Sequence, residues 1–190
     1  GYADMLLLIG IPYNSDEGVA FGESLMRFVN ETAHAESEML AKARGAFPLY
    51  PESTLTVPRR NATVTTIAPT GTLSMIAGCS SGIEPVFAYA YTRNIMDGTE
   101  LVEVNPVLNA RLAELNLSSA ELAEKIASSG TIAHIDELPE ELRRVFVCAH
   151  DISPVYHTHM QAAFQRHTDN AVSKTVNFPA SATRRDVAEV

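Results

Sequence analysis

The segment from Asn61 to Gly78 constrains the fold more than any other part of this sequence. Thr63, Val64, Thr65, Thr66 and Ile67 are all β-branched, and a run this short and β-branched is typical of a buried strand. Residues 68–72 break that strand, and residues 73–77 form a short helical pattern that Gly78 ends. Strand, tight loop and helix therefore follow one another directly, and this order favours an α/β fold over an all-helical bundle.

The rest of the sequence continues this interleaving of helices and strands. A long amphipathic helix is expected from Ser15, its N-cap, to Gly45, with an apolar face that includes Phe21, Leu25, Phe28 and Met39. Asp97-Gly98 is the strongest hairpin signal and joins strands at 87–96 and 100–104. The other expected elements are a strand at 172–178 and helices at 3–9, 106–115, 120–128 and 140–149, the last with Pro139 in its first turn. Two more helices are expected, one that begins at Ser153-Pro154 and one that begins at Arg184 with Thr183 as its N-cap.

Composition excludes several classes of protein. The 190 residues are 46% hydrophobic, enough for one globular unit spanning 1–190. A formal charge of −9 with no basic patch argues against nucleic-acid partners, and no apolar run approaches the roughly 20 residues that cross a bilayer. Two distant cysteines fit a reducing compartment, so we expect a cytoplasmic protein. The chain opens directly at Gly1 and stops inside a helical pattern, so we expect a fragment.

The loop Ala68-Pro69-Thr70-Gly71-Thr72 has the composition of a phosphate cradle. It precedes a helix, where free backbone N–H groups and the helix dipole favour an anion. Thr70, Thr72 and Ser74 add hydroxyl groups, and Gly71 is expected to permit close approach and a φ angle that a side chain would make unfavourable. Since the lysine of a Walker loop is missing, an ordinary capped turn remains the alternative interpretation.

A second loop of small residues, Gly78 to Pro85, can place Cys79, Ser81, Gly82 and Glu84 beside a ligand held by the first loop. Glu84 can equally satisfy neighbouring N–H groups, and Cys79 has no adjacent base or cation to activate it. Cys148 lies in an apolar run and is expected to be core. We expect no metal site, because His157 and His159 point about 200° apart on a helix. His34, His134 and His167 are expected to be solvated or hydrogen-bonded.

Taken together, these segments resemble the later part of the catalytic α chain of a ribonucleotide reductase, most closely the adenosylcobalamin-dependent class II form. The resemblance is carried mainly by residues 60–63, 66–72, 74 and 80–85. Further stretches that support it are 10–13, 44–45, 47–48, 103–106, 150–152, 160–165 and Asp169-Asn170-Ala171-Val172-Ser173-Lys174-Thr175-Val176-Asn177-Phe178-Pro179.

The resemblance implies the later portion of a ten-stranded α/β barrel, with strands interleaved with helices. It implies that the loop from Pro69 to Thr72 holds the substrate's phosphates, and that the full-length enzyme uses adenosylcobalamin. The family removes the 2′-hydroxyl of a ribonucleotide with a cysteine radical, and its radical cysteine lies between an Asn and a Glu, each two residues away. Neither Cys79 nor Cys148 has this setting, so no catalytic residue is assigned and the chain alone is expected to be inactive.

Two other interpretations stay open at this stage. One is a class I α chain, whose radical comes from a metal-containing partner subunit. The other is a non-catalytic module that binds nucleotide phosphate. As a piece of a barrel, the chain is expected to need the remainder of the same catalytic chain, and to self-associate through exposed strand edges without it.

Overall fold

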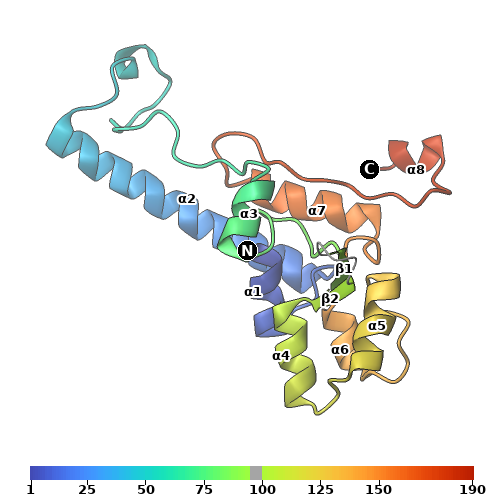
Figure 1. Cartoon of the computed structure of the whole chain (residues 1–190). Helices are drawn as coiled ribbons and strands as arrows, with labels where there is room; N and C mark the ends of the chain where they lie inside the picture. The colour runs from blue at the N-terminus through green and yellow to red at the C-terminus, as the bar shows by residue number, and fades with distance from the viewer. Residues whose placement is uncertain (95–99) are drawn as a thin grey trace.

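The computed structural model describes residues 1–94 and 100–190, and Figure 1 shows their arrangement. The described part is rich in helix and carries one small sheet. In chain order the elements are α1 (Tyr2–Ile9), α2 (Asp16–Arg44), the 3₁₀ turn η1 (Tyr50–Glu52), α3 (Gly71–Ala77), β1 (Ala90–Asn94), β2 (Glu100–Val104), α4 (Pro106–Glu114), α5 (Ala120–Ser129), α6 (Glu140–Val145), α7 (Pro154–Gln165) and α8 (Arg184–Ala188).

Local capping explains where most helices begin and end. The Ser15 hydroxyl accepts a hydrogen bond from the Gly18 N–H at 3.0 Å, which satisfies one of the free N–H groups of the first turn of α2. Gly10 ends α1 with a φ of 77°. Thr183 and Asp186 form a reciprocal capping box at the start of α8. The predicted starts at Ser15 and Thr183 are confirmed.

Helix α2 crosses α7 near its N-terminal end, and its C-terminal part extends away from the body of the molecule (Figure 1). At the crossing the Tyr2 and Phe164 rings meet edge to face with centroids 4.9 Å apart, beside Gly22. The predicted buried face of α2 is partly wrong. Phe28 and Met39 are exposed, because only the first turns of α2 meet α1 and α7.

The hairpin is the only sheet in the described ranges, 1–94 and 100–190. β1 and β2 are antiparallel with Ala90 opposite Val104, and α5 packs against both strands. Tyr89, Leu108, Ile126 and Ile132 are fully or almost fully buried beneath them. The predicted hairpin pairing is confirmed, and β2 has the predicted bounds, but β1 begins at Ala90 and not at residue 87. The Asp97-Gly98 turn lies outside the described residues.

The strands predicted at 61–67 and 172–178 are wrong as regular strands. The two segments do run side by side in parallel, but they form only an isolated bridge between Ile67 and Val172. Hydrogen bonds that involve side chains replace here the backbone hydrogen bonds of a regular strand pair. The Val64 N–H donates to the Asp169 carboxylate at 2.7 Å, and the Asp169 N–H donates to the Thr65 hydroxyl at 3.0 Å.

The helix predicted at 140–149 needs correction at both ends. The helix expected at 140–149 ends at Val145, since the Asp151 carboxylate accepts the Cys148 N–H at 3.0 Å and fixes a turn there. Pro139 is the N-cap of α6 and not a first-turn residue. In α7 the buried residues are His157, Met160, Ala163 and Phe164, and His167 lies beyond the end of the helix.

None of the helices described, on either side of residues 95–99, has the length and apolar character needed to cross a membrane.

Candidate functional site

The two loops that the sequence singles out pack against each other. The Ser81 hydroxyl donates to the Pro69 carbonyl at 2.7 Å, and the Thr70 and Ser81 hydroxyl oxygens lie 3.5 Å apart. Gly82 has a φ of 49°, and a Cβ at that position would stand 3.7 Å from the Ala68 carbonyl oxygen. Residues 68–72 and 78–85 therefore form one surface, as the sequence predicts.

The backbone at the start of α3 differs from the prediction. Gly71 is the first residue of α3 and has no positive φ, and a Cβ there would meet no atom within 4 Å beyond its chain neighbours. The expectation that Gly71 supplies conformational freedom is wrong. The left-handed residue is Thr70, with φ 45° and ψ 26°. A β-branched residue rarely adopts this region, and holding one there costs about 1–3 kcal/mol.

The hydroxyl groups of the two loops differ in whether they already donate a hydrogen bond within the protein. Ser74 donates its proton to the Gly71 carbonyl at 2.7 Å, and Ser81 donates its proton to Pro69. Each hydroxyl has one proton to donate, so neither can give that proton to an anion without releasing its present acceptor. Thr72 is therefore the better-placed hydroxyl donor, next to the N–H groups that the first turn of α3 leaves without an intrahelical partner. Thr70 can donate to an anion by releasing only its long 3.5 Å contact with the Ser81 hydroxyl, whose own proton goes to Pro69.

Two cavities adjoin these loops. The larger one has a volume of about 1000 Å³, and Ser74, Cys79, Ser81 and Glu84 line it together with residues of β1, β2 and the C-terminal segment. A second cavity of about 400 Å³ is lined by Ala68, Thr70 and Gly82 among others. Pro69, Gly71 and Thr72 are exposed on the surface of the same loop. Seven of the ten predicted site residues thus line one of these two cavities, while Pro69, Gly71 and Thr72 line neither.

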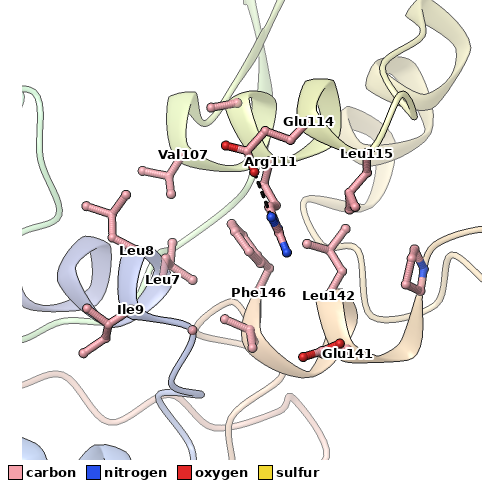
Figure 2. Close-up of a pocket in the computed structure, with 14 residues that line it drawn as sticks. Leu7, Leu8, Ile9, Val107, Arg111, Glu114, Leu115, Glu141, Leu142 and Phe146 are labelled. Carbon is pink, nitrogen blue, oxygen red and sulfur yellow. Dashed lines mark hydrogen bonds and ion pairs between the residues drawn. The ribbon is translucent and has the colours of Figure 1, made fainter.

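A third cavity, of about 410 Å³, lies elsewhere, between α1, α4 and α6 (Figure 2). Leu7, Leu142 and Phe146 line it, and Arg111 reaches across it while paired with Glu114 at 2.7 Å. No residue predicted for the site lines this cavity. Its walls are largely apolar side chains that belong to the helix interfaces, so we assign it no ligand.

Glu84 is held in an ion pair that the sequence reasoning missed. Its carboxylate lies 2.6 Å from the Lys174 ammonium and accepts the Thr175 N–H at 2.7 Å. Lys174 also reaches His157 Nδ1 at 2.9 Å. In the sequence, Lys174 belongs to the stretch 169–179 that carries the family resemblance, and that stretch does not indicate its partner. The sequence does contain a signal for an ion pair, because Lys174 is the only lysine in a weakly charged predicted strand. A lysine that is buried in such a strand needs a carboxylate partner.

A second polar cluster holds the segment that leads into the phosphate loop. His34 Nε2 lies 2.9 Å from the Asp169 carboxylate, which also accepts the Val64 N–H. Burial raises the pKa of Asp169, but the hydrogen bonds from His34 and Val64 outweigh burial and lower this pKa overall. Of the two alternatives predicted for His34, solvated or hydrogen-bonded, the structure shows the hydrogen-bonded one. Through Asp169, the long helix α2 is therefore connected to the segment that begins at Val64 and leads into the loop 68–72.

Tyr13 holds the second loop, residues 78–85, in place. Its buried hydroxyl donates to the Ile83 carbonyl at 2.7 Å, and burial raises its pKa well above the usual value. Cys79 is exposed at the rim of the larger cavity, and Cys148 is buried as predicted, where burial raises the pKa of its thiol. Among residues 1–94 and 100–190 no three His, Cys, Asp or Glu side chains are grouped so that they can hold a metal ion.

The geometry brings two loops and the start of α3 together beside two cavities, and comparison with known proteins identifies the family. The chain matches the ribonucleotide reductase barrel-domain family over residues 1–59 and 56–190. Because the match covers the whole chain, this protein belongs to the ribonucleotide reductase barrel-domain family.

Its relatives narrow the class further. It is 47% identical over 191 residues to the vitamin B12-dependent ribonucleoside-diphosphate reductase of Thermoplasma acidophilum, covering 99% of this chain and 25% of that protein. It is also 47% identical over 192 residues to the enzyme of the same description from Mycobacterium tuberculosis H37Rv, covering 100% of this chain and 27% of that protein. The chain therefore spans about a quarter of the length of these curated relatives.

A solved structure shares the fold. The class Id ribonucleotide reductase α subunit of Actinobacillus ureae superposes with a TM-score of 0.84 at 25% sequence identity, covering 100% of this chain and 34% of that one. The suspected family resemblance is confirmed. The described residues show a helix-rich arrangement with one hairpin, so the ten-stranded barrel remains a proposal.

Proposed function

We propose that this chain is the later part of the catalytic barrel of an adenosylcobalamin-dependent ribonucleotide reductase, working as one unit with the remainder of that chain. The observation that carries the proposal is the 47% identity to B12-dependent reductases along the whole chain. The full enzyme would convert ribonucleoside di- or triphosphates to the deoxyribonucleotides used in DNA synthesis. Two unpaired cysteines favour a reducing compartment, and we place the enzyme in the cytoplasm.

In this proposal the chain's own residues bind and orient the substrate. The surface formed by residues 68–72 holds the phosphates through backbone N–H groups and the hydroxyls of Thr70 and Thr72. Glu84 and the wall of the larger cavity lie beside the rest of the nucleotide, in a volume that suits one. The radical step belongs to a cysteine in the Asn-x-Cys-x-Glu setting, which Cys79 and Cys148 lack, so the isolated 190-residue chain performs no reduction.

The residues described here do not by themselves form the cobalamin site. A corrinoid with its adenosyl and nucleotide groups is much larger than a nucleotide, while the largest of the cavities described above, about 1000 Å³, is already at the upper end for a small ligand. The cofactor therefore belongs to the full-length enzyme in this proposal.

We expect the longer reductase that contains these residues to form deoxyribonucleotide from ribonucleotide only when adenosylcobalamin and a dithiol reductant are both present. Product is measured by chromatography, with the cofactor omitted as control. A class I reductase is the second candidate, favoured by the class Id structural relative. Turnover that needs a metal-loaded partner subunit and no cobalamin would establish that candidate, whereas nucleotide binding without any turnover would indicate a binding module.

We expect replacement of both Thr70 and Thr72 by Val in the longer reductase to weaken nucleoside diphosphate binding about tenfold or more, since two hydroxyl donors to a charged group are lost. Binding of the matching nucleoside, which has no phosphate, should be unchanged. Thr92→Val, at an exposed position of β1, is the matched control. Calorimetric titration measures all three proteins. Equal weakening for nucleotide and nucleoside would remove the phosphate assignment.

A further inference from the structure

Lys174 is a buried charge with every donor used. Its side chain is 0% exposed, and an ammonium in such a place is costly unless it is paired and hydrogen-bonded. Its three N–H donors meet three acceptors: the Glu84 carboxylate at 2.6 Å, His157 Nδ1 at 2.9 Å and the Thr175 carbonyl. The clamp formed by Glu84, Lys174 and His157 therefore joins the second loop, α7 and the C-terminal segment.

The hydrogen bonds also determine the protonation of His157. The Ala149 carbonyl can only accept, so His157 Nε2, 3.2 Å away, carries the proton. Nδ1 is then left with a lone pair that accepts from Lys174. Burial and the neighbouring Lys174 charge lower the pKa of His157, which keeps the ring neutral. His157 thus acts as a fixed acceptor that orients the ammonium toward Glu84.

Glu84 is the one member of the clamp that reaches a cavity. Its side chain is 26% exposed and lines the larger cavity with Ser74 and Ser81. Lys174 and the Thr175 N–H occupy two of the roughly four acceptor positions of a carboxylate, so Glu84 can accept further hydrogen bonds from a bound molecule. The adjacent Lys174 charge offsets that of Glu84, which reduces its repulsion of an anionic nucleotide.

We propose that Lys174 is a positioning residue, which holds the Glu84 carboxylate at the cavity wall so that it accepts a hydrogen bond from a neutral donor group on the sugar or base of the nucleotide. This inference rests on the proposed function. Phosphate is not the group recognised, because a carboxylate and a phosphate repel each other. Lys174 acts through Glu84 and does not itself touch the substrate, since its three N–H groups already have acceptors.

The test uses the longer reductase with Lys174→Met, with Glu84→Gln and with both changes. Lys174→Met should lower the melting temperature, because Glu84 and His157 lose their donor. It should also raise KM about tenfold, the cost of losing one hydrogen bond to a charged group, with kcat changed less than about threefold. Lys125→Met, whose partners Glu121 and Glu137 are exposed, is the matched control and should change neither.

The double variant separates positioning from stability. Removing both charges should recover most of the melting temperature lost in Lys174→Met, while KM stays about tenfold high because no held carboxylate remains. It also keeps the inference testable if Lys174→Met alone does not fold. Full recovery of KM together with stability, or a normal KM in Lys174→Met, would overturn the inference. A wild-type enzyme that reduces no ribonucleotide would instead refute the proposed function, leaving Lys174 no substrate to position.

Discussion

Gly22→Val is expected to destabilise the protein by about 3 kcal/mol, the upper range for overpacking a well-filled interface. A Cβ at position 22 would lie 2.6 Å from Cε2 of Phe164 and 2.9 Å from the hydroxyl oxygen of Tyr2. The Phe164 ring is buried in the core, and the Tyr2 hydroxyl is fixed by a 2.6 Å hydrogen bond to the Gly18 carbonyl. Neither group can move aside without separating α2 from α7 or α1.

The same substitution at another helical glycine provides the control for Gly22→Val. Gly71→Val adds its side chain to open space at a helical φ, so its effect on stability should stay below about 0.5 kcal/mol. For a chain of this size, 3 kcal/mol corresponds to a fall in melting temperature of about 6–12 °C. Circular dichroism during heating measures both variants. Equal melting temperatures for Gly22→Val and the unmodified chain would show that the α2–α7 contact does not determine stability.

The isolated 190-residue chain is expected to self-associate, and the structure changes the reason. Residues 61–67 and 172–178 pair with each other over a short stretch, so their edges are partly used. α3 exposes more apolar surface that favours association: it has no buried residue, and Met75 and Ile76 are 76% and 79% exposed. Phe28 and Met39 add exposed apolar surface on α2. Such surfaces are covered in stable monomers, and here we propose that the remainder of the catalytic chain covers them.

Sedimentation at micromolar concentration measures this association. The unmodified chain should form oligomers and bind an apolar dye, and Ile76→Lys should shift it toward monomer at little cost to stability, since the replaced side chain packs against no core. Asn109→Lys, at an exposed polar position of α4, adds the same charge and should leave association unchanged. A stable monomer that binds no dye would show that the chain completes its own core.

The site was predictable from sequence to the extent that its residues are close in the chain. The loop 68–72, the helix after it and the second loop to Pro85 are consecutive, so their contact through Ser81 and Pro69 involves a separation of only 12 residues. The clamp on Glu84 could not be found in this way. Lys174 lies 90 residues from Glu84, and nothing local to either residue specifies the partner.

The sequence by itself determined the elements whose stability is local. The caps at Ser15 and Thr183 work through atoms within a few residues, so both were predicted correctly. β1 and β2 are close in the chain, so their pairing was also predicted, although β1 begins three residues later than expected. Tertiary structure decided the rest. The β-branched residues 63–67 favour an extended backbone, but a strand also needs a neighbour with free N–H and C=O groups along its length. Asp169, 105 residues away, takes the Val64 N–H with its side chain instead, and the ladder stops at one bridge.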